Sequence, residues 1–131
     1  MAATRATTRV LLVDDESLVR RILKDILAAY HDLELVGEAA NGKEAISAVE
    51  RLQPDVVVMD IRMPALDGIA AAREIRIKYP KVKIIGLSEY AYSYNTDAME
   101  RAGAAAVYQK SMAFEELYAA IKKVTAVDPA L

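Results

Sequence analysis

The chain has no cysteine among its 131 residues. It can therefore form neither disulfide bonds nor a zinc site with thiolate ligands, and nothing indicates an oxidising compartment. An excess of positive charge is also missing. The formal net charge is -2, which excludes a general basic surface for nucleic acid or an anionic membrane. No apolar run approaches membrane-spanning length, and the polar N-terminal stretch lacks the apolar segment of a secretory signal. We expect a soluble cytoplasmic protein that by itself binds neither DNA nor a membrane.

Length and hydrophobicity predict a single domain. A chain of this length with 54% hydrophobic residues can bury one sizeable core but not two. We expect the domain to span residues 9–125, between an N-terminal tail at 1–8 and a C-terminal tail or start of a linker at 126–131. Internal repeats and low-complexity segments are absent.

The hydrophobic pattern alternates five times between short apolar runs and helical spacing. The apolar runs predict strands at 10–13, 33–39, 56–59, 82–87 and 104–108. Three- and four-residue spacing predicts helices within 19–27, 44–52, 69–79, 95–102 and from Ser111 to Val124. Such alternation is typical of an α/β fold, a doubly wound (βα)5 domain with a parallel five-stranded sheet and right-handed crossovers.

Polar side chains stand where several of these predicted strands end. They are Asp14, Asp15, Asp60, Ser88 and Lys110. Parallel strands bring such positions to one edge of the sheet, where ligands bind in folds of this kind. Clustered carboxylates with a hydroxyl and an ammonium suit a divalent metal and a phosphoryl group.

Simpler interpretations exist for each residue alone. Asp14-Asp15-Glu16 before a helix could serve only as a cap and compensate the helix dipole. Lys110 alone would be an ordinary surface lysine, and Ser88 could be a turn residue. Capping does not explain why Asp60 and Lys110 also fall at strand ends, so we favour a common site.

Taken together, these motifs resemble the receiver domain of response regulators in two-component signalling. The resemblance covers about residues 9–125 and rests on five features in the family's order: Asp14-Asp15, Asp60, Met63-Pro64 with Asp67-Gly68, Ser88, and Tyr108-Gln109-Lys110. It implies the flavodoxin-like strand order 2-1-3-4-5.

The resemblance also implies roles for the site residues. Asp60 would be the phosphoacceptor, taking a phosphoryl group from a histidine kinase or phosphotransfer protein. Magnesium would be bound by the side chains of Asp15 and Asp60, by Asp14 largely through water, and by the backbone carbonyl of Arg62. Lys110 and the Ser88 hydroxyl would contact phosphoryl oxygens.

A switch is implied as well. Ser88 would move toward the phosphate and Tyr108 would turn inward, reshaping the surface made by the fourth helix, fifth strand and fifth helix. An output domain, another partner or a phosphorylation-dependent homodimer would use that surface.

The chain departs from the family's pattern at a few positions. Ser111 follows the lysine where many receivers have proline, as in receivers of LuxR-type regulators or hybrid sensor kinases. Three further residues, Arg62, Glu89 and Tyr90, stand at positions whose side chains, in this family, modulate the reactions of the phosphorylated aspartate. We expect Glu89 to slow phosphorylation by small anionic donors, the alternative being a solvated surface acid.

We therefore predict a signalling switch without turnover of an external substrate. One alternative is an aspartyl-nucleophile phosphohydrolase, but Asp60-Ile61-Arg62 lacks the second acid of that class. Another is a receiver-like docking module that takes no phosphate. The sequence does not name the kinase, stimulus or output, or distinguish a stand-alone regulator from a domain of a longer protein.

Overall fold

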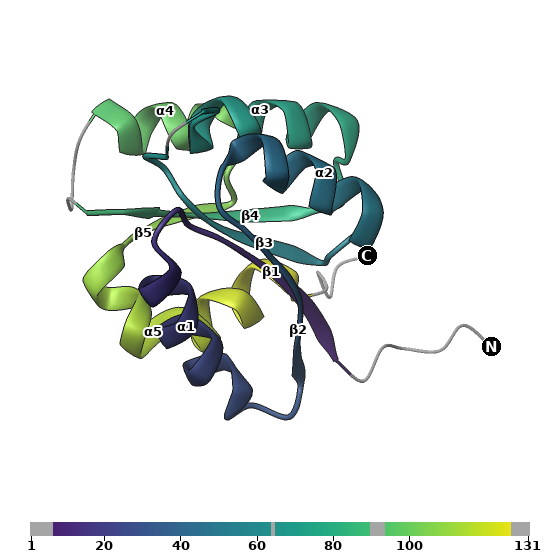
Figure 1. Cartoon of the computed structure of the whole chain (residues 1–131), viewed down its shortest axis with the longest axis vertical. Helices are drawn as coiled ribbons and strands as arrows, with labels where there is room; N and C mark the ends of the chain where they lie inside the picture. Colours follow the sequence, from purple (N-terminus) through teal and green to yellow (C-terminus); the bar gives the residue numbers. More distant parts are fainter. Residues whose placement is uncertain (1–6, 64, 90–93, 127–131) are drawn as a thin grey trace.

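The protein is a three-layer sandwich with one parallel sheet between two layers of helices (Figure 1). The computed structural model describes residues 7–63, 65–89 and 94–126. Helices α2, α3 and α4 cover one face of the sheet, and α1 and α5 cover the other. The strand order is β2-β1-β3-β4-β5, which confirms the predicted flavodoxin-like arrangement.

Strands and helices alternate along the chain. The strands are β1 (Thr8–Val13), β2 (Leu33–Ala39), β3 (Val56–Asp60), β4 (Lys83–Ser88) and β5 (Ala106–Gln109). The helices are α1 (Ser17–Ala28), α2 (Gly42–Leu52), α3 (Gly68–Lys78), α4 (Tyr94–Ala102) and α5 (Lys110–Thr125).

The predicted elements agree with the structure apart from their ends. β1 begins at Thr8, inside the expected tail. β5 lies further toward the C-terminus than predicted: it covers Ala106–Gln109, and the prediction is 104–108. α5 begins at Lys110, so the lysine follows the end of β5 as predicted, but it is also the first residue of the helix, one residue before the expected start at Ser111. The regularly spaced apolar residues that predict this helix begin later in the chain, so they do not indicate its first turn.

The sheet places alternate residues of each strand in two separate cores. Leu11, Val57 and Met59 pack under α2, α3 and α4, whereas their neighbours Leu12 and Val58 pack under α1 and α5. All five residues of β3 are buried, as expected for a central strand covered on both faces. β2 lies at the edge, and Glu34 and Glu38 there are exposed. Burial in both cores fixes β1 and β3 as the rigid centre of the sheet.

Helix α2 begins with a side-chain cap at Asn41. The Asn41 side chain accepts a hydrogen bond from the Glu44 N–H at 2.9 Å. The Glu44 carboxylate reaches back to Ala40 N at 3.3 Å, one residue before the cap. Asp67 caps α3 in the same way by accepting from Ala70 N at 2.9 Å.

Helix α5 is tied to the loop before β2 by a cluster of polar and aromatic side chains. The rings of Tyr30 and Tyr118 stack with centroids 3.9 Å apart. Tyr118 Oη donates to Asp32 at 2.7 Å, and Lys122 Nζ lies 3.0 Å from the same carboxylate. These contacts join α5 to the segment between α1 and β2, at the side of the sheet where β2 begins.

None of the helices in the described ranges is both long enough and apolar enough to cross a membrane.

Gly68 begins α3 where the helix passes directly over the end of β3. Its N–H donates to Ile61 O at 2.8 Å. A Cβ at this position would lie 2.3 Å from the carbonyl oxygen of Asp60 and 2.9 Å from Ile61 Cα. Both atoms are backbone, so a side chain could fit only if the chain around Asp60 moved.

We predict that Gly68→Ala lowers the free energy of unfolding by about 1–3 kcal/mol, the usual cost of overpacking. Urea unfolding followed by circular dichroism measures this change. Gly37→Ala is the matched control, because its Cβ would meet mainly the flexible end of Leu52, at 2.7 Å. Equal losses of stability in the two variants would contradict the assigned role of Gly68.

Candidate functional site

Three carboxylates gather at the carboxyl ends of β1 and β3. These strands are neighbours in the sheet, with Val13 opposite Met59, so the residues that follow are brought together. Asp14, Asp15 and Asp60 each offer an oxygen within 4.8 Å of the others. Asp14 is 2% exposed and Asp60 5%, whereas Asp15 is exposed. The predicted convergence of these three acids is therefore present in the fold.

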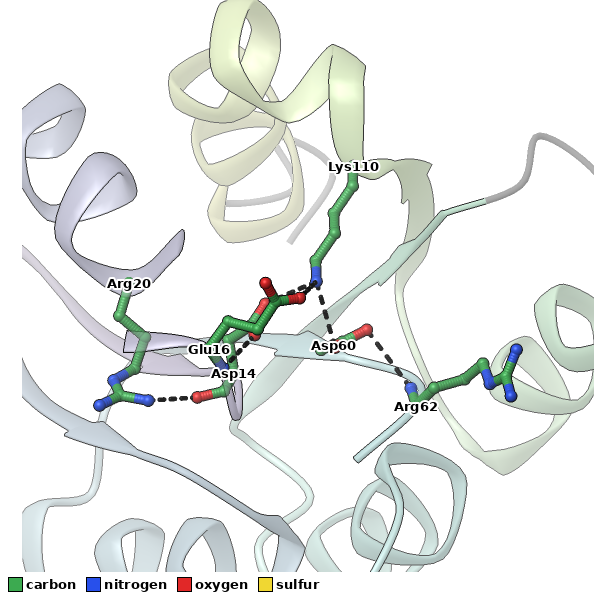
Figure 2. Close-up of polar contacts among 6 residues, drawn as sticks. All are labelled: Asp14, Glu16, Arg20, Asp60, Arg62 and Lys110. Carbon is green, nitrogen blue, oxygen red and sulfur yellow. Dashed lines mark hydrogen bonds and ion pairs between the residues drawn. The ribbon is translucent and has the colours of Figure 1, made fainter. Parts of the chain in front are cut away.

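Lys110 lies over this acidic cluster from the first turn of α5 (Figure 2). Its Nζ is 2.9 Å from Asp14 Oδ2 and 3.2 Å from Asp60 Oδ2. Burial would lower the pKa of this ammonium, but the close contact with Asp14 and the charge of Asp60 outweigh it and raise the pKa above its usual value. The lysine is therefore the counter-ion of both buried acids.

The Asp60 carboxyl has an unusually high affinity for its proton. Burial is the largest cause, the Lys110 charge opposes it, and the Asp14 charge adds to it, so the pKa rises from 3.8 to about 6. Asp60 Oδ1 also accepts a hydrogen bond from the Arg62 N–H at 3.3 Å. Removal from water thus outweighs the favourable contacts.

The loop from Asp14 to Glu16 is held by short local contacts. Asp14 Oδ1 accepts a hydrogen bond from Glu16 N at 2.9 Å, and Arg20 donates from Nη1 to the Asp14 carbonyl oxygen. Glu16 Oε1 lies 4.0 Å from Lys110 Nζ. Sequence reasoning considered Glu16 only as a cap and missed Arg20 completely, because its second partner, Glu38, is 18 residues away.

The remaining predicted residues lie around this cluster. Ser88 ends β4 and is buried, and the residue before it, Leu87, pairs with Asp60. Tyr108 in β5 is partly buried and packs against the core under α1 and α5. The Arg62 side chain extends away from the carboxylates (Figure 2). Glu89 is exposed. Glu16, which follows the two aspartates, lies 4.0 Å from Lys110 Nζ. Tyr90 lies outside the described residues.

An open pocket adjoins the cluster between the β3–α3 loop and α4. It has a volume of about 400 Å³ and is lined by Ile61, Arg62, Met63, Asp67, Ile69 and Asn95. The loop that carries the predicted Arg62 ligand is therefore accessible from solvent on one side.

The donor set fits a hard divalent cation. Asp14 Oδ2 is buried and has no hydrogen bond of good geometry, although the Lys110 ammonium is close to it. A buried carboxylate oxygen without a directed partner is costly, and a metal ion would satisfy it. All candidate ligands are oxygens, as magnesium and calcium prefer.

The chain matches a family model along most of its length. Residues 10–122 match the response regulator receiver domain.

Sequence relatives give the same result but are longer proteins. A protein-glutamate methylesterase/protein-glutamine glutaminase 2 of Photobacterium profundum is 44% identical over 96 residues, which are 72% of this chain and 24% of that protein. The uncharacterized transcriptional regulatory protein YhcZ of Bacillus subtilis is 38% identical, covering 83% of this chain and 51% of that protein. The chain thus spans a quarter to a half of these relatives, and the activities in their names belong to the whole proteins.

Solved structures agree. The response regulator domain of Thermotoga maritima CheB has a TM-score of 0.85 at 34% identity, with 94% of this chain and 99% of that chain covered. A LuxR-family two-component response regulator from Aurantimonas sp. has a TM-score of 0.86 at 31% identity, with 95% and 91% covered. With its strand order, its acidic cluster and a family match from residue 10 to residue 122, the chain belongs to the response regulator receiver domains.

Proposed function

We propose that Asp60 accepts a phosphoryl group from a phosphohistidine of a kinase or phosphotransfer protein. The observation that carries this proposal is the Asp60 carboxylate itself, buried beside Asp14 and within 3.2 Å of the Lys110 ammonium. A buried carboxylate beside an ammonium is a suitable nucleophile for an aspartyl phosphate. The chain would then act as a signalling switch without turnover of an external substrate.

In this reaction an Asp60 Oδ attacks the phosphorus of the donor. The new O–P bond forms as the P–N bond breaks, and the imidazole leaves with the electron pair of that bond. Lys110 would neutralise one phosphoryl oxygen, and the Ser88 hydroxyl would donate to another. Asp60 must be ionised to attack, and the Lys110 charge favours the ionised form because it opposes the rise of the pKa that burial causes.

We assign magnesium to the acidic cluster. Asp15 and Asp60 would bind it through their side chains, Asp14 through water, and Arg62 through its backbone carbonyl. When bound, magnesium would contact a phosphoryl oxygen and offset the negative charge of the transferred group.

The signal would leave through the surface of α4, β5 and α5. Ser88 and Tyr108 would couple phosphorylation to this surface. α5 exposes Met112 and Phe114 in its first turns, close to Lys110 in sequence. An output domain, another partner or a second phosphorylated copy would bind there, and we expect the protein to act in the cytoplasm.

Covalent phosphorylation is predicted at Asp60. Acetyl phosphate or phosphoramidate with magnesium should add one phosphate to the wild-type chain, detected by intact-mass spectrometry. Asp60→Asn should abolish the adduct because the nucleophilic oxygen is lost. Asp25→Asn, a substitution of an exposed acid on α1, should leave it unchanged. An adduct that persists in Asp60→Asn would refute the assignment.

Magnesium is predicted to stabilise the folded chain, because an ion that binds only the native state raises its stability by mass action. At about 100 times its Kd, the gain is about 2.7 kcal/mol. Thermal melts with magnesium and with EDTA measure the gain. Asp15→Asn should reduce it, whereas Asp25→Asn should not. A gain equal to that of wild type in Asp15→Asn would place the ion elsewhere.

Metal-free stability should depend on pH through Asp60. Its folded pKa of about 6 lies above its ordinary 3.8, so the protonated carboxyl favours the folded state. This contribution to the free energy of unfolding is fully present below about pH 4 and is lost as the pH rises through 6.

Asp60→Asn should consequently be more stable than wild type at pH 7.5 in EDTA, by at most about 3 kcal/mol. The two should converge near pH 4, as measured by urea unfolding across the pH range. Asp25→Asn controls for the change in net charge. A difference between Asp60→Asn and wild type that stays constant with pH would argue against the raised pKa.

A further inference from the structure

We propose that Arg20 is a positioning residue, which orients the peptide between Asp14 and Asp15 so that their carboxylates can bind a divalent cation. The inference rests on the proposed function, because it concerns the same metal site. Arg20 itself touches neither the metal position nor the phosphoryl position.

Arg20 joins three parts of the fold. From the first turns of α1, its Nη1 donates to the Asp14 carbonyl oxygen, while its Nε lies 3.1 Å from Glu38 Oε1 on the edge strand β2. Its side chain is only 18% exposed. The planar guanidinium therefore makes two directed contacts at once, which a lysine ammonium on a flexible stem cannot reproduce with the same geometry.

Every polar group of Asp14 except one has a fixed hydrogen-bond partner. Its N–H donates to Ala39 O at 3.1 Å, its carbonyl accepts from Arg20, and its Oδ1 accepts from Glu16 N at 2.9 Å. Only Oδ2 lacks a hydrogen bond, and it points to the site beside Lys110. Among these hydrogen bonds, the one from Arg20 is the only one donated by a side chain, so it can be removed by a substitution that leaves the Asp14 carboxylate intact.

The planarity of the peptide bond explains how a contact at the carbonyl acts on the carboxylates. The Asp14 C=O and the Asp15 N–H lie in one rigid plane. Fixing the direction of the C=O therefore also fixes the direction of the Asp15 N–H and the positions of the two Cα atoms that carry the carboxylate side chains. Figure 2 shows Arg20 and Lys110 approaching Asp14 from different sides.

The charge of Arg20 cannot account for such a role. A cation near the site would oppose binding of a second cation, and its ion pair with Glu38 largely cancels this effect. Positioning and charge thus predict opposite results when Arg20 is replaced. Removal of a positioning contact weakens magnesium binding, whereas removal of a repelling charge strengthens it.

The test is the Kd of magnesium, measured by isothermal titration calorimetry on the whole chain. The variants are Arg20→Lys, Arg20→Gln and the double variant Arg20→Gln/Glu38→Gln, in which the loss of both charges keeps the net charge. Arg21→Lys and Arg21→Gln are the matched controls, because Arg21 is the next residue on α1 and is exposed. Melts in EDTA set a temperature at which all variants are folded.

We expect each Arg20 variant to bind magnesium about tenfold more weakly, as is usual when a residue that orients a metal ligand is lost. The Arg21 controls should bind like wild type. At saturating magnesium, Arg20→Lys should still reach the wild-type extent of phosphorylation with phosphoramidate, because its defect lies in metal binding alone.

Three results would overturn the inference. Wild-type affinity in Arg20→Lys and in the double variant would show that the contact does not position the ligands. Tighter binding in Arg20→Gln, with Arg20→Lys unchanged, would show that only the charge matters. Phosphorylation of Arg20→Lys that does not recover at saturating magnesium would place its effect outside the metal site. If wild type itself binds no magnesium, the proposed function fails, and this inference fails with it.

Discussion

The structure depends on the placement of like charges at one edge of a buried sheet. β1 and β3 end side by side, and their terminal carboxylates would repel one another without a cation between them. The Lys110 ammonium supplies one such cation, 2.9 Å from Asp14 and 3.2 Å from Asp60. Burial away from water still has a larger effect on the pKa of Asp60 than the Lys110 charge has. The acids of the site thus repel one another, and a divalent ion would reduce this repulsion.

The repulsion persists because rigid surroundings hold the acids in place. β1 and β3 are buried on both faces, and Gly68 brings α3 against the backbone of Asp60. Movement of either strand to separate the carboxylates would expose core residues on both sides of the sheet. The cost of relaxation therefore exceeds the cost of the repulsion, as is common at functional sites.

The sequence predicted the fold and the convergence of Asp14, Asp15, Asp60 and Lys110, because strand ends in a parallel sheet share one edge. It missed the start of α5, since no apolar periodicity marks Lys110. It also missed Arg20, whose contacts join residues that no local pattern connects. Glu16 was noticed only as part of a cap, although its carboxylate lies 4.0 Å from Lys110. Long-range contacts of polar side chains are what a single sequence conceals.

The covering of both sheet faces restricts the approach to Asp60. In the part of the chain that the structure describes, helices cover both faces of the sheet and Asp60 is 5% exposed, so a donor would approach from the carboxyl ends of the strands, beside the open pocket at the β3–α3 loop. The loops after β1 and β3 and the first turn of α5 lie at that edge of the sheet. A protein donor would therefore need to present its phosphoryl group on a projecting side chain, whereas a small donor could enter without docking. The fold would thus select donors by their shape before any contact with the lysine is made.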